Sequence, residues 1–397
     1  MNNLQNDGWD FTDLKYIDAS DADVANYRLN KGDILFNRTN SAELVGKCEV
    51  FREDGDWLYA SYLIRVVVDK KLALPEFVSA FLNTPAGRLQ IERISRRIAG
   101  MSNVNAEELR SLVLPLPENL DLQRKLTEEL YAAKAKRDQL ERDSQSLLTS
   151  TDQLLMEKLG INMVDASDRK AFCVRAGMMK SSQRFSAAYF HPERVLSIRA
   201  IEKAQTQGIR SARLDEIADF IQEKVPFKPG MKYLGLANVQ SNTGELIETD
   251  DEPSGLCPTF KPGDVLMTRL RPYLNKVHLA EFKGICSPEF HVIRVKPQVS
   301  NDLNVHSEYL AMILRTSLIL SQTRHMITGN THPRLANEDV VGLVVPIPSL
   351  SVQSELVKVA KQRRDEARGL RKKAREHWED AKVRFESRLL DLPGDER

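Results

Sequence analysis

The residue types that carry catalytic or metal chemistry occur in this chain without the spacing that such chemistry needs. The seven histidines are scattered, and none forms H-E-x-x-H or pairs with a cysteine at zinc-ligand spacing. Gly46-Lys47 lacks the upstream glycine of a phosphate-binding loop, because position 41 is serine. Asp33 and Asp264 each follow a turn glycine, where aspartate far more often caps the turn than binds a metal. The sequence therefore predicts a chain without catalytic activity or a cofactor of its own.

The chain contains an internal repeat. Three short motifs occur twice, in the same order and at nearly the same spacing: residues 32–38 and 263–269 (GDILFNR and GDVLMTR), 62–66 and 291–295 (YLIRV and HVIRV), and 114–117 and 345–348 (LPLP and VPIP). Each match alone is weak. Together they indicate two copies of one domain.

Each copy reads as a mixed α+β domain. The Gly-Asp pair marks a turn, and the apolar residues after it predict a strand. Residues 62–68 predict a buried strand, and residues 75–97 predict a helix opened by a proline, with a counterpart at 307–326. A polar loop with a glycine follows in each copy, at residues 100–105 and 329–334. A short helix or turn and a last strand then lead to the Pro-x-Pro element.

A long helix is predicted after each Pro-x-Pro element. In the first helix, Leu126, Ala133, Leu140, Leu147 and Leu154 recur every seven residues, which is typical of a coiled-coil seam. In the second helix four alanines recur at the same interval, and the matching large residues are Leu356, Leu370, Trp378 and Phe385. Helices of about forty residues, roughly 60 Å long, exceed what one domain face needs. We therefore expect the two helices to pair with each other.

Composition narrows the class of protein. With 397 residues, 42% hydrophobic and 28% charged, the chain has the mixture of a globular protein of two or three domains. No apolar run approaches the roughly 20 residues of a membrane span, residues 1–10 do not resemble a signal peptide, and the four cysteines form no CxxC pair. A cytoplasmic location is expected.

Net charge is only +1, but residues 361–375 hold eight basic residues against two acidic ones. That stretch is either a solvated helix face or a surface for phosphate or a partner.

The duplicated arrangement resembles the specificity subunits of type I restriction–modification systems. A Gly-Asp strand ending in arginine, a Pro-x-Pro element, a following glutamine (Gln123, Gln353) and a heptad helix are all used twice. Residues 184–193 (RFSAAYFHPE) also resemble the opening of such recognition domains. The resemblance implies two target-recognition domains and two long conserved helices in an antiparallel coiled coil. The expected boundaries are 1–118 and 161–349 for the domains, and 119–160 and 350–393 for the helices.

The resemblance also implies partners. We expect double-stranded DNA, two methyltransferase subunits docked on the helices, and motor-nuclease subunits for restriction, but no membrane. S-adenosylmethionine, ATP and magnesium would be used by those partner subunits and not by this chain. The chain would be the non-catalytic reader of a two-part DNA target in phage defence. Because the helices are about 60 Å long, two different half-sites should flank a spacer of fixed length.

The first copy departs from this pattern. Residues 15–17 (KYI) match residues 232–234 (KYL). Upstream of residue 232 the second copy has about sixty further residues, including a strand-like stretch at 214–221, whereas upstream of residue 15 almost nothing remains. The first domain is therefore expected to lack its opening segment. A late start codon, a natural truncation and a partner that supplies the missing strand are all open explanations.

Polar loops at strand ends are the expected DNA contacts, because arginine pairs with guanine while asparagine or glutamine pairs with adenine. The candidates in the first copy are Asn37, Arg38, Asn40, Lys47 and Asn103. The candidates in the second copy are Arg269, Arg271, Tyr273, Asn275, Lys276, Asn330, Thr331, His332 and Arg334. A coiled-coil scaffold whose duplicated α+β domains bind another protein rather than DNA is the alternative.

Overall fold

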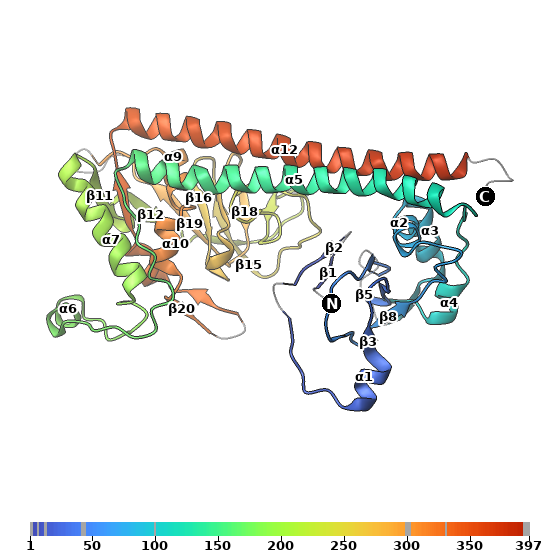
Figure 1. Ribbon diagram of the computed structural model, residues 1–397. Coiled ribbons are helices and arrows are strands. Elements are labelled where there is room, and N and C mark those ends of the chain that lie inside the picture. The colour runs from blue at the N-terminus through green and yellow to red at the C-terminus, as the bar shows by residue number, and fades with distance from the viewer. Residues whose placement is uncertain are drawn as a thin grey trace. The chain divides into compact units, whose positions relative to one another are not determined.

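The computed structural model describes residues 3–5, 8–11, 14–40, 45–98, 101–297, 303–329 and 332–391. The chain divides into two compact units, Met1–Asp143 with Gly369–Arg397 (the first unit) and Ser144–Arg368 (the second unit). The two long helices are α5 (Leu120–Lys158) and α12 (Leu350–Leu390), drawn in green and red in Figure 1. Their ends coincide within two or three residues with the boundaries expected for the conserved helices. The compact units divide each helix, so each unit holds one domain and part of both helices.

The first unit is built around a small antiparallel sheet. Its strand order is β6-β4-β8, where β6 is Cys48–Val50, β4 is Ile34–Asn37 and β8 is Leu63–Val66. Central β4 is buried along its whole length, since its four residues pack into the core. The remaining elements are β1 (Leu4–Gln5), β2 (Gly8–Trp9), α1 (Asp21–Tyr27), β3 (Arg28–Leu29), β5 (Thr39–Asn40), β7 (Trp57–Leu58), α2 (Pro75–Leu82), α3 (Pro85–Ile94), β9 (Arg96–Ile98), β10 (Met101–Asn103) and α4 (Ala106–Arg110).

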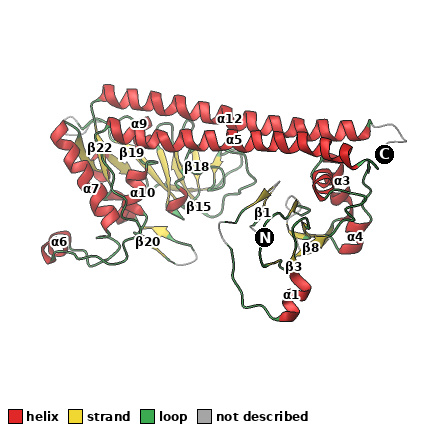
Figure 2. Ribbon diagram, viewed as in Figure 1, coloured by secondary structure: helices red, strands yellow, loops and turns green. Residues whose placement is uncertain are grey.

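The second unit has two four-stranded sheets, with orders β12-β19-β16-β17 and β13-β15-β18-β14. Figure 2 draws the strands of this unit in yellow and its helices in red. Their strands are β12 (Ala218–Phe220), β13 (Lys224–Pro226), β14 (Tyr233–Leu234), β15 (Leu256–Phe260), β16 (Val265–Thr268), β17 (Val277–Leu279), β18 (Gly284–Cys286) and β19 (Phe290–Val295). Around them lie α6 (Ala176–Ser182), α7 (Pro192–Ala204), η1 (Gln205–Gln207), β11 (Arg210–Arg213), α8 (Leu214–Ile217), η2 (Pro272–Leu274), α9 (Ser307–Ile313), α10 (Ser317–Thr323), β20 (Ile327–Thr328), β21 (Arg334–Leu335), α11 (Asn337–Val341) and β22 (Val344–Ile347). The expected α+β class is confirmed for both copies.

The single helix expected over residues 75–97 is wrong, because the structure has two helices there. Helix α2 ends at Leu82, and α3 begins at Pro85, whose ring cannot continue a preceding helix. Thr84 caps α3 by accepting a hydrogen bond from the Gly87 amide at 3.2 Å. The second copy is broken in the same place, between α9 and α10.

The two Gly-Asp turns have the same geometry. Gly32 and Gly263 adopt φ values of 96° and 87°, in the left-handed region that favours glycine. The next residue in each turn caps it: Asp33 accepts from the Asn30 amide at 2.8 Å, and Asp264 accepts from the Lys261 amide at 2.9 Å. The turn-capping role expected for both aspartates is confirmed.

The two copies differ at the edges of their sheets. In the second unit β12 pairs with the outer edge of β19, and β11 pairs with β22. Within the described residues of the first unit, no strand pairs with the outer edge of β8 or with residues 113–116. Val113 is accordingly 72% exposed, whereas its counterpart Val344 lies in a paired strand. The two copies therefore differ in strand pairing at these two edges.

Helices α5 and α12 run antiparallel in each unit. In the second unit Lys158 pairs with Glu355 at 2.6 Å, and the Ser144 hydroxyl donates to the Ala367 carbonyl at 2.9 Å. In the first unit Leu126 packs in one apolar cluster with Trp378 and Phe385. Of the other seam residues, Leu356 is fully buried, whereas Leu140, Leu147, Leu154 and Leu370 are half-buried. Within the part of the chain that the structure describes, no helix is both long enough and apolar enough to cross a membrane.

The four cysteines are free thiols. Cys48, Cys257 and Cys286 are buried in the cores, and burial raises the pKa of Cys257 and raises that of Cys286 to about 12. Cys173 lies exposed in the segment before α6.

A fully buried glutamine joins each long helix to its domain. The Gln123 side chain accepts from the Leu74 amide at 2.9 Å and donates to the Leu72 and Pro117 carbonyls at 2.9 and 2.7 Å. Gln353 repeats this pattern, accepting from His306 at 2.9 Å and donating to Asn304 and Pro348 at 2.8 and 2.9 Å. Each glutamine thus satisfies three buried backbone groups at the start of its helix.

Gln123→Leu and Gln353→Leu should each destabilise one unit. Leucine fills similar space but leaves one amide and two carbonyls without a partner, which costs roughly 2–4 kcal/mol. Chemical denaturation of the full chain, followed by circular dichroism, measures the loss. The control is Gln145→Leu at an exposed position of α5. A loss no larger than that of the control would contradict this role.

Candidate nucleic-acid interface

In each unit the structure brings together the two polar segments that the sequence singled out. In the first unit β5 pairs with β10, and the Val104 amide donates to the Arg38 carbonyl at 2.9 Å. In the second unit residues 269–271 lie against residues 333–335, and the Leu335 amide donates to the Arg269 carbonyl at 2.9 Å. We call residues 38–40 with 102–104, and 269–271 with 333–335, the paired segments. They occupy equivalent positions of the two copies.

The paired segment of the first unit presents Arg38 on the surface. Arg38 is half-buried, and its guanidinium makes no hydrogen bond or ion pair with the residues that the structure describes. Lys47 and Asn103 are also half-buried, and Asn103 pairs with Thr39, the residue after Arg38. Asn37 is only 1% exposed, because it ends the buried strand β4, so its side chain does not lie where a base could reach it. For Asn40 the structure describes the backbone, which pairs with Ser102.

The paired segment of the second unit has Arg271 on the surface, and Tyr273 and His332 are exposed just beyond its two ends. Arg271 adopts φ 48°, a left-handed conformation that is uncommon for a residue other than glycine and that gathers at functional sites. The Pro333 carbonyl accepts from the Arg271 amide at 2.7 Å. Among the described residues its guanidinium has no partner. Asn330 and Thr331 lie outside the described residues.

Asn275 and Lys276 are directed into the protein, contrary to their expected place on the reading surface. Asn275 is 5% exposed, and its amide donates to the Arg315 carbonyl at 2.7 Å. Lys276 donates to the Leu236 carbonyl at 2.7 Å, and burial lowers the pKa of its ammonium group. Both side chains therefore satisfy backbone carbonyls within the second unit.

Glu289 holds one of the expected DNA-reading arginines. The Arg334 guanidinium donates to both carboxylate oxygens of Glu289, at 2.7 to 3.1 Å. These hydrogen bonds, and then the charges of Arg334 and Arg269, lower the pKa of Glu289. Arg334 is thus exposed but paired, whereas Arg271 is exposed and unpaired within the described chain. Sequence reasoning missed Glu289, because its partner lies 45 residues away.

Part of the basic stretch at 361–375 makes contacts inside the second unit. Arg364 donates to the Thr243 carbonyl at 3.3 Å, Arg368 pairs with Glu245, and Arg363 donates to the Ser150 hydroxyl at 3.3 Å. For these three residues the structure favours an intramolecular role over a phosphate-binding surface.

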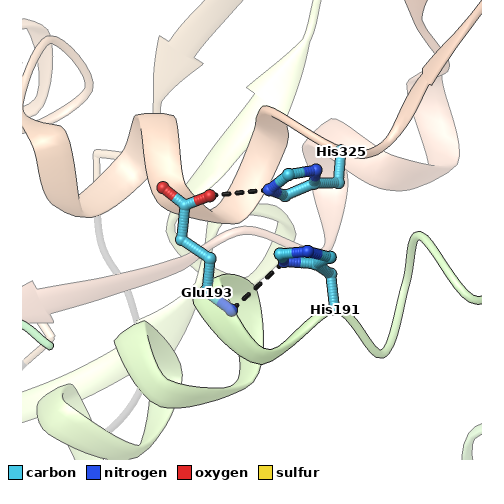
Figure 3. A group of neighbouring side chains, drawn as sticks. All are labelled: His191, Glu193 and His325. Atoms are coloured by element: carbon cyan, nitrogen blue, oxygen red, sulfur yellow. Dashed lines mark hydrogen bonds and ion pairs between the residues drawn. The ribbon is translucent and has the colours of Figure 1, made fainter. Parts of the chain in front are cut away.

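His191, Glu193 and His325 form a cluster at the start of α7 (Figure 3). His191 caps the helix by accepting from the Glu193 amide at 3.3 Å, while its other ring nitrogen lies 3.1 Å from the Arg169 carbonyl. The Glu193 carboxylate contacts His325 at 2.7 Å and Arg324 at 2.8 Å. The two imidazoles stack with their ring centroids 3.4 Å apart. The ring nitrogens of His191, the Nε2 of His325 and the Glu193 carboxylate, which a metal would need as ligands, already make these contacts. We therefore interpret the cluster as a helix cap joined to an ion pair.

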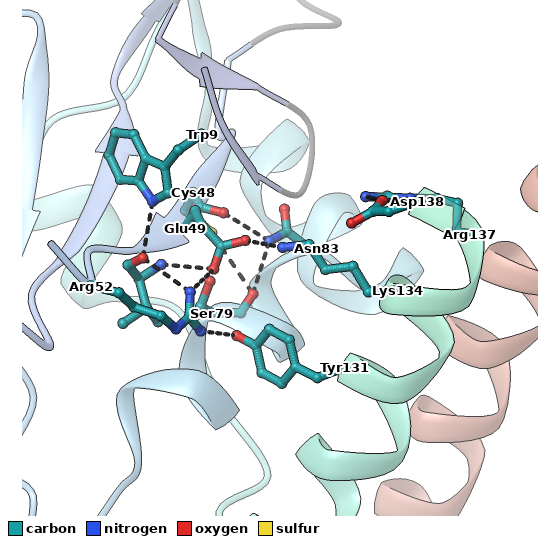
Figure 4. A network of polar contacts seen from close by, with 11 residues as sticks. Trp9, Cys48, Glu49, Arg52, Ser79, Asn83, Tyr131, Lys134, Arg137 and Asp138 are labelled. Carbon is teal, nitrogen blue, oxygen red and sulfur yellow. Dashed lines mark hydrogen bonds and ion pairs between the residues drawn. The ribbon is translucent and has the colours of Figure 1, made fainter. Parts of the chain in front are cut away.

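A second polar network joins the first domain to α5 (Figure 4). The buried Glu49 carboxylate pairs with Lys134 at 2.6 Å and with Arg52 at 3.2 Å. Arg52 also donates to the Tyr131 hydroxyl at 2.9 Å, and burial is the main cause of the raised pKa of Tyr131. Because both cationic side chains that contact Glu49 also donate hydrogen bonds to it, this network fixes the domain on the helix rather than offering a free site.

The chain shares sequence with specificity subunits over part of its length. It is 30% identical over 129 residues to the specificity subunit of the type I restriction enzyme EcoKI of Escherichia coli (strain K12), covering 31% of this chain and 27% of that protein. It is 26% identical over 156 residues to the EcoDI specificity subunit of Escherichia coli, covering 38% and 33%. The matched segments thus span about a quarter to a third of these curated relatives. No family model matches the chain.

The fold gives a broader match. A chain from the structure titled as the basis of complex assembly and conformational transition of the type I R-M system superposes with a TM-score of 0.51 at 16% identity, covering 93% of this chain and 83% of that one. At this identity the match concerns the fold alone. The expected resemblance is confirmed: the chain is similar to type I restriction enzyme specificity subunits in sequence over about a third of its length, and similar in fold to a chain of a type I R-M system over nearly all of its length.

Proposed function

We propose that this chain is the DNA-specificity subunit of a type I restriction–modification complex, with one half-site read by each unit. The observation that carries the proposal is the pair of equivalent paired segments, which hold Arg38 and Arg271 with guanidinium groups that bond to nothing in the described chain. An arginine guanidinium on a fixed strand end can donate two hydrogen bonds at once to the O6 and N7 acceptors of guanine in the major groove. Different residues in the two segments favour two different half-sites.

The proposal includes partners and their cofactors. Methyltransferase subunits, two in number, would dock on α5 and α12, and motor-nuclease subunits would join for restriction. S-adenosylmethionine, ATP and magnesium would belong to those subunits, and the complex would act on DNA in the cytoplasm. The similarity to the EcoKI and EcoDI specificity subunits supports this assignment.

The purified chain alone should neither methylate nor cleave DNA and should not hydrolyse ATP, because its sequence carries no nucleotide-binding or methyltransferase motif. Methyl transfer from labelled S-adenosylmethionine, phosphate release from ATP and plasmid cleavage are the three measurements. Turnover in any of them that persists through further purification would overturn the subunit assignment.

Arg271→Ala should weaken binding to the preferred DNA by about 1–3 kcal/mol and relax only one half-site, because the lost bidentate contact specifies a single base. Arg38→Ala should relax only the other half-site. Selection of bound duplexes from a random library, followed by sequencing, measures both effects.

The matched control is Arg199→Ala, an exposed arginine on α7 away from the paired segments. Its binding motif should equal that of the unmodified chain. A single variant that relaxed both half-sites would contradict separate reading by the two units.

Glu289→Gln should raise the affinity for DNA of arbitrary sequence. The substitution removes the negative charge that holds Arg334 and lies near Arg269, so that an additional cation becomes available to phosphates. The slope of log K against log salt should steepen by about one unit. Fluorescence anisotropy on a non-specific duplex at several salt concentrations tests this, and an unchanged slope would count against a DNA-facing Glu289.

A further inference from the structure

The second unit contains a cavity of about 310 Å³ beside its paired segment. Its apolar lining includes Phe220, Phe290 and Val292, and its polar lining includes Arg269, Lys224 and His291. Two of these groups are cationic, and none of the residues that line the cavity is acidic. The cavity therefore combines apolar walls with a preference for hydrogen-bond acceptors or anions.

His291 gives the cavity an unused hydrogen-bond acceptor. The residue is 5% exposed, and its Nε2 has no partner among the described residues. Burial and the Arg269 charge lower the pKa of His291 to about 4, so the ring is neutral at pH 7. The Leu335 backbone opposes this shift. A neutral ring protonated at Nδ1 carries a bare lone pair at Nε2, the nitrogen without a partner among the described residues.

Arg269 supplies donors at the same cavity. Its backbone is fixed on both sides, since its amide donates to the Glu289 carbonyl at 2.8 Å and its carbonyl accepts from Leu335 at 2.9 Å. Its Nε is buried and has no acceptor within the described chain. A buried donor and a buried acceptor without hydrogen-bond partners cost the folded chain free energy. A ligand that bonds to both groups would recover that free energy.

We propose that this cavity binds one guanine nucleotide. Guanine offers the acceptors O6 and N7 to an arginine fork and N–H donors to a bare imidazole nitrogen. The planar base matches the apolar walls and the ring of Phe220, and the phosphate matches Lys224 at the exposed end of the lining. Inorganic phosphate would leave the His291 acceptor and the apolar walls unused, and an apolar ligand would leave both cations unused.

The nucleotide has two possible sources with the same chemistry. A base stacked in a duplex shows only its edge, so the guanine must be either free or unstacked from DNA. Binding of free nucleotide is measured without DNA, so the result of this titration does not depend on the proposed function.

The test is isothermal titration of the full chain with 5′-GMP, 5′-CMP and inorganic phosphate. We expect saturable binding of one GMP, with CMP and phosphate at least about tenfold weaker. His291→Leu and Lys224→Ala should each weaken GMP binding by about tenfold, whereas His291→Gln, which keeps an acceptor, should retain most of it. The control Lys228→Ala, at an exposed position outside the cavity, should bind GMP normally.

Several results would overturn the proposal: no saturable GMP binding up to about 10 mM, equal affinity for phosphate alone, or unchanged GMP binding in both Lys224→Ala and His291→Leu. Lys224 is exposed, so its variant keeps the test valid even if His291→Leu fails to fold.

A competition experiment distinguishes free nucleotide from a guanine unstacked from DNA. Displacement of GMP by a duplex with an extrahelical guanine, but not by the fully paired duplex, assigns the site to DNA, and displacement by neither assigns it to the free nucleotide.

Discussion

The two units depend on one constraint: backbone groups that are buried where a domain meets its long helix must still be hydrogen-bonded. Gln123 and Gln353 meet it identically, each binding the loop before a helix and the Pro-x-Pro element at once. A second duplicated pair, Gln90 and Gln322, binds the residues before that element, through two hydrogen bonds each to the backbones of Val113 and Val344. The start of each long helix is therefore joined to its domain by side chains that make no hydrogen bond to the paired segments.

Under the proposed function, this division of roles would let one framework carry two different DNA readers. The contacts that align residues 38–40 with 102–104, and 269–271 with 333–335, are made by backbone atoms. Their side chains are consequently free to differ without loss of the pairing. Under the proposed function, Arg271 and Arg38 would then specify different bases, while Glu289 holds Arg334.

The sequence was enough to predict the repeat, the strands that follow the Gly-Asp turns and the long helices, because these depend on short-range periodicity and on turn residues. It did not predict that Asn275 and Lys276 turn inward, since their acceptors are backbone carbonyls of Arg315 and Leu236 that no local pattern reveals. Glu289 and His291 were missed for the same reason. The break at Thr84 could have been found, because Pro85 marks it in the sequence.

The distribution of thiols has a practical consequence for chemical labelling. Alkylating reagents attack the thiolate, and burial both shields Cys48, Cys257 and Cys286 and, for the last two, disfavours ionisation. A maleimide dye at neutral pH should therefore modify the native chain at Cys173 alone. Its neighbour Phe172 lies with its ring 5.6 Å from that of His191, so the dye would sit beside the cap of α7 and act as a built-in optical reporter of that segment, without any engineered cysteine.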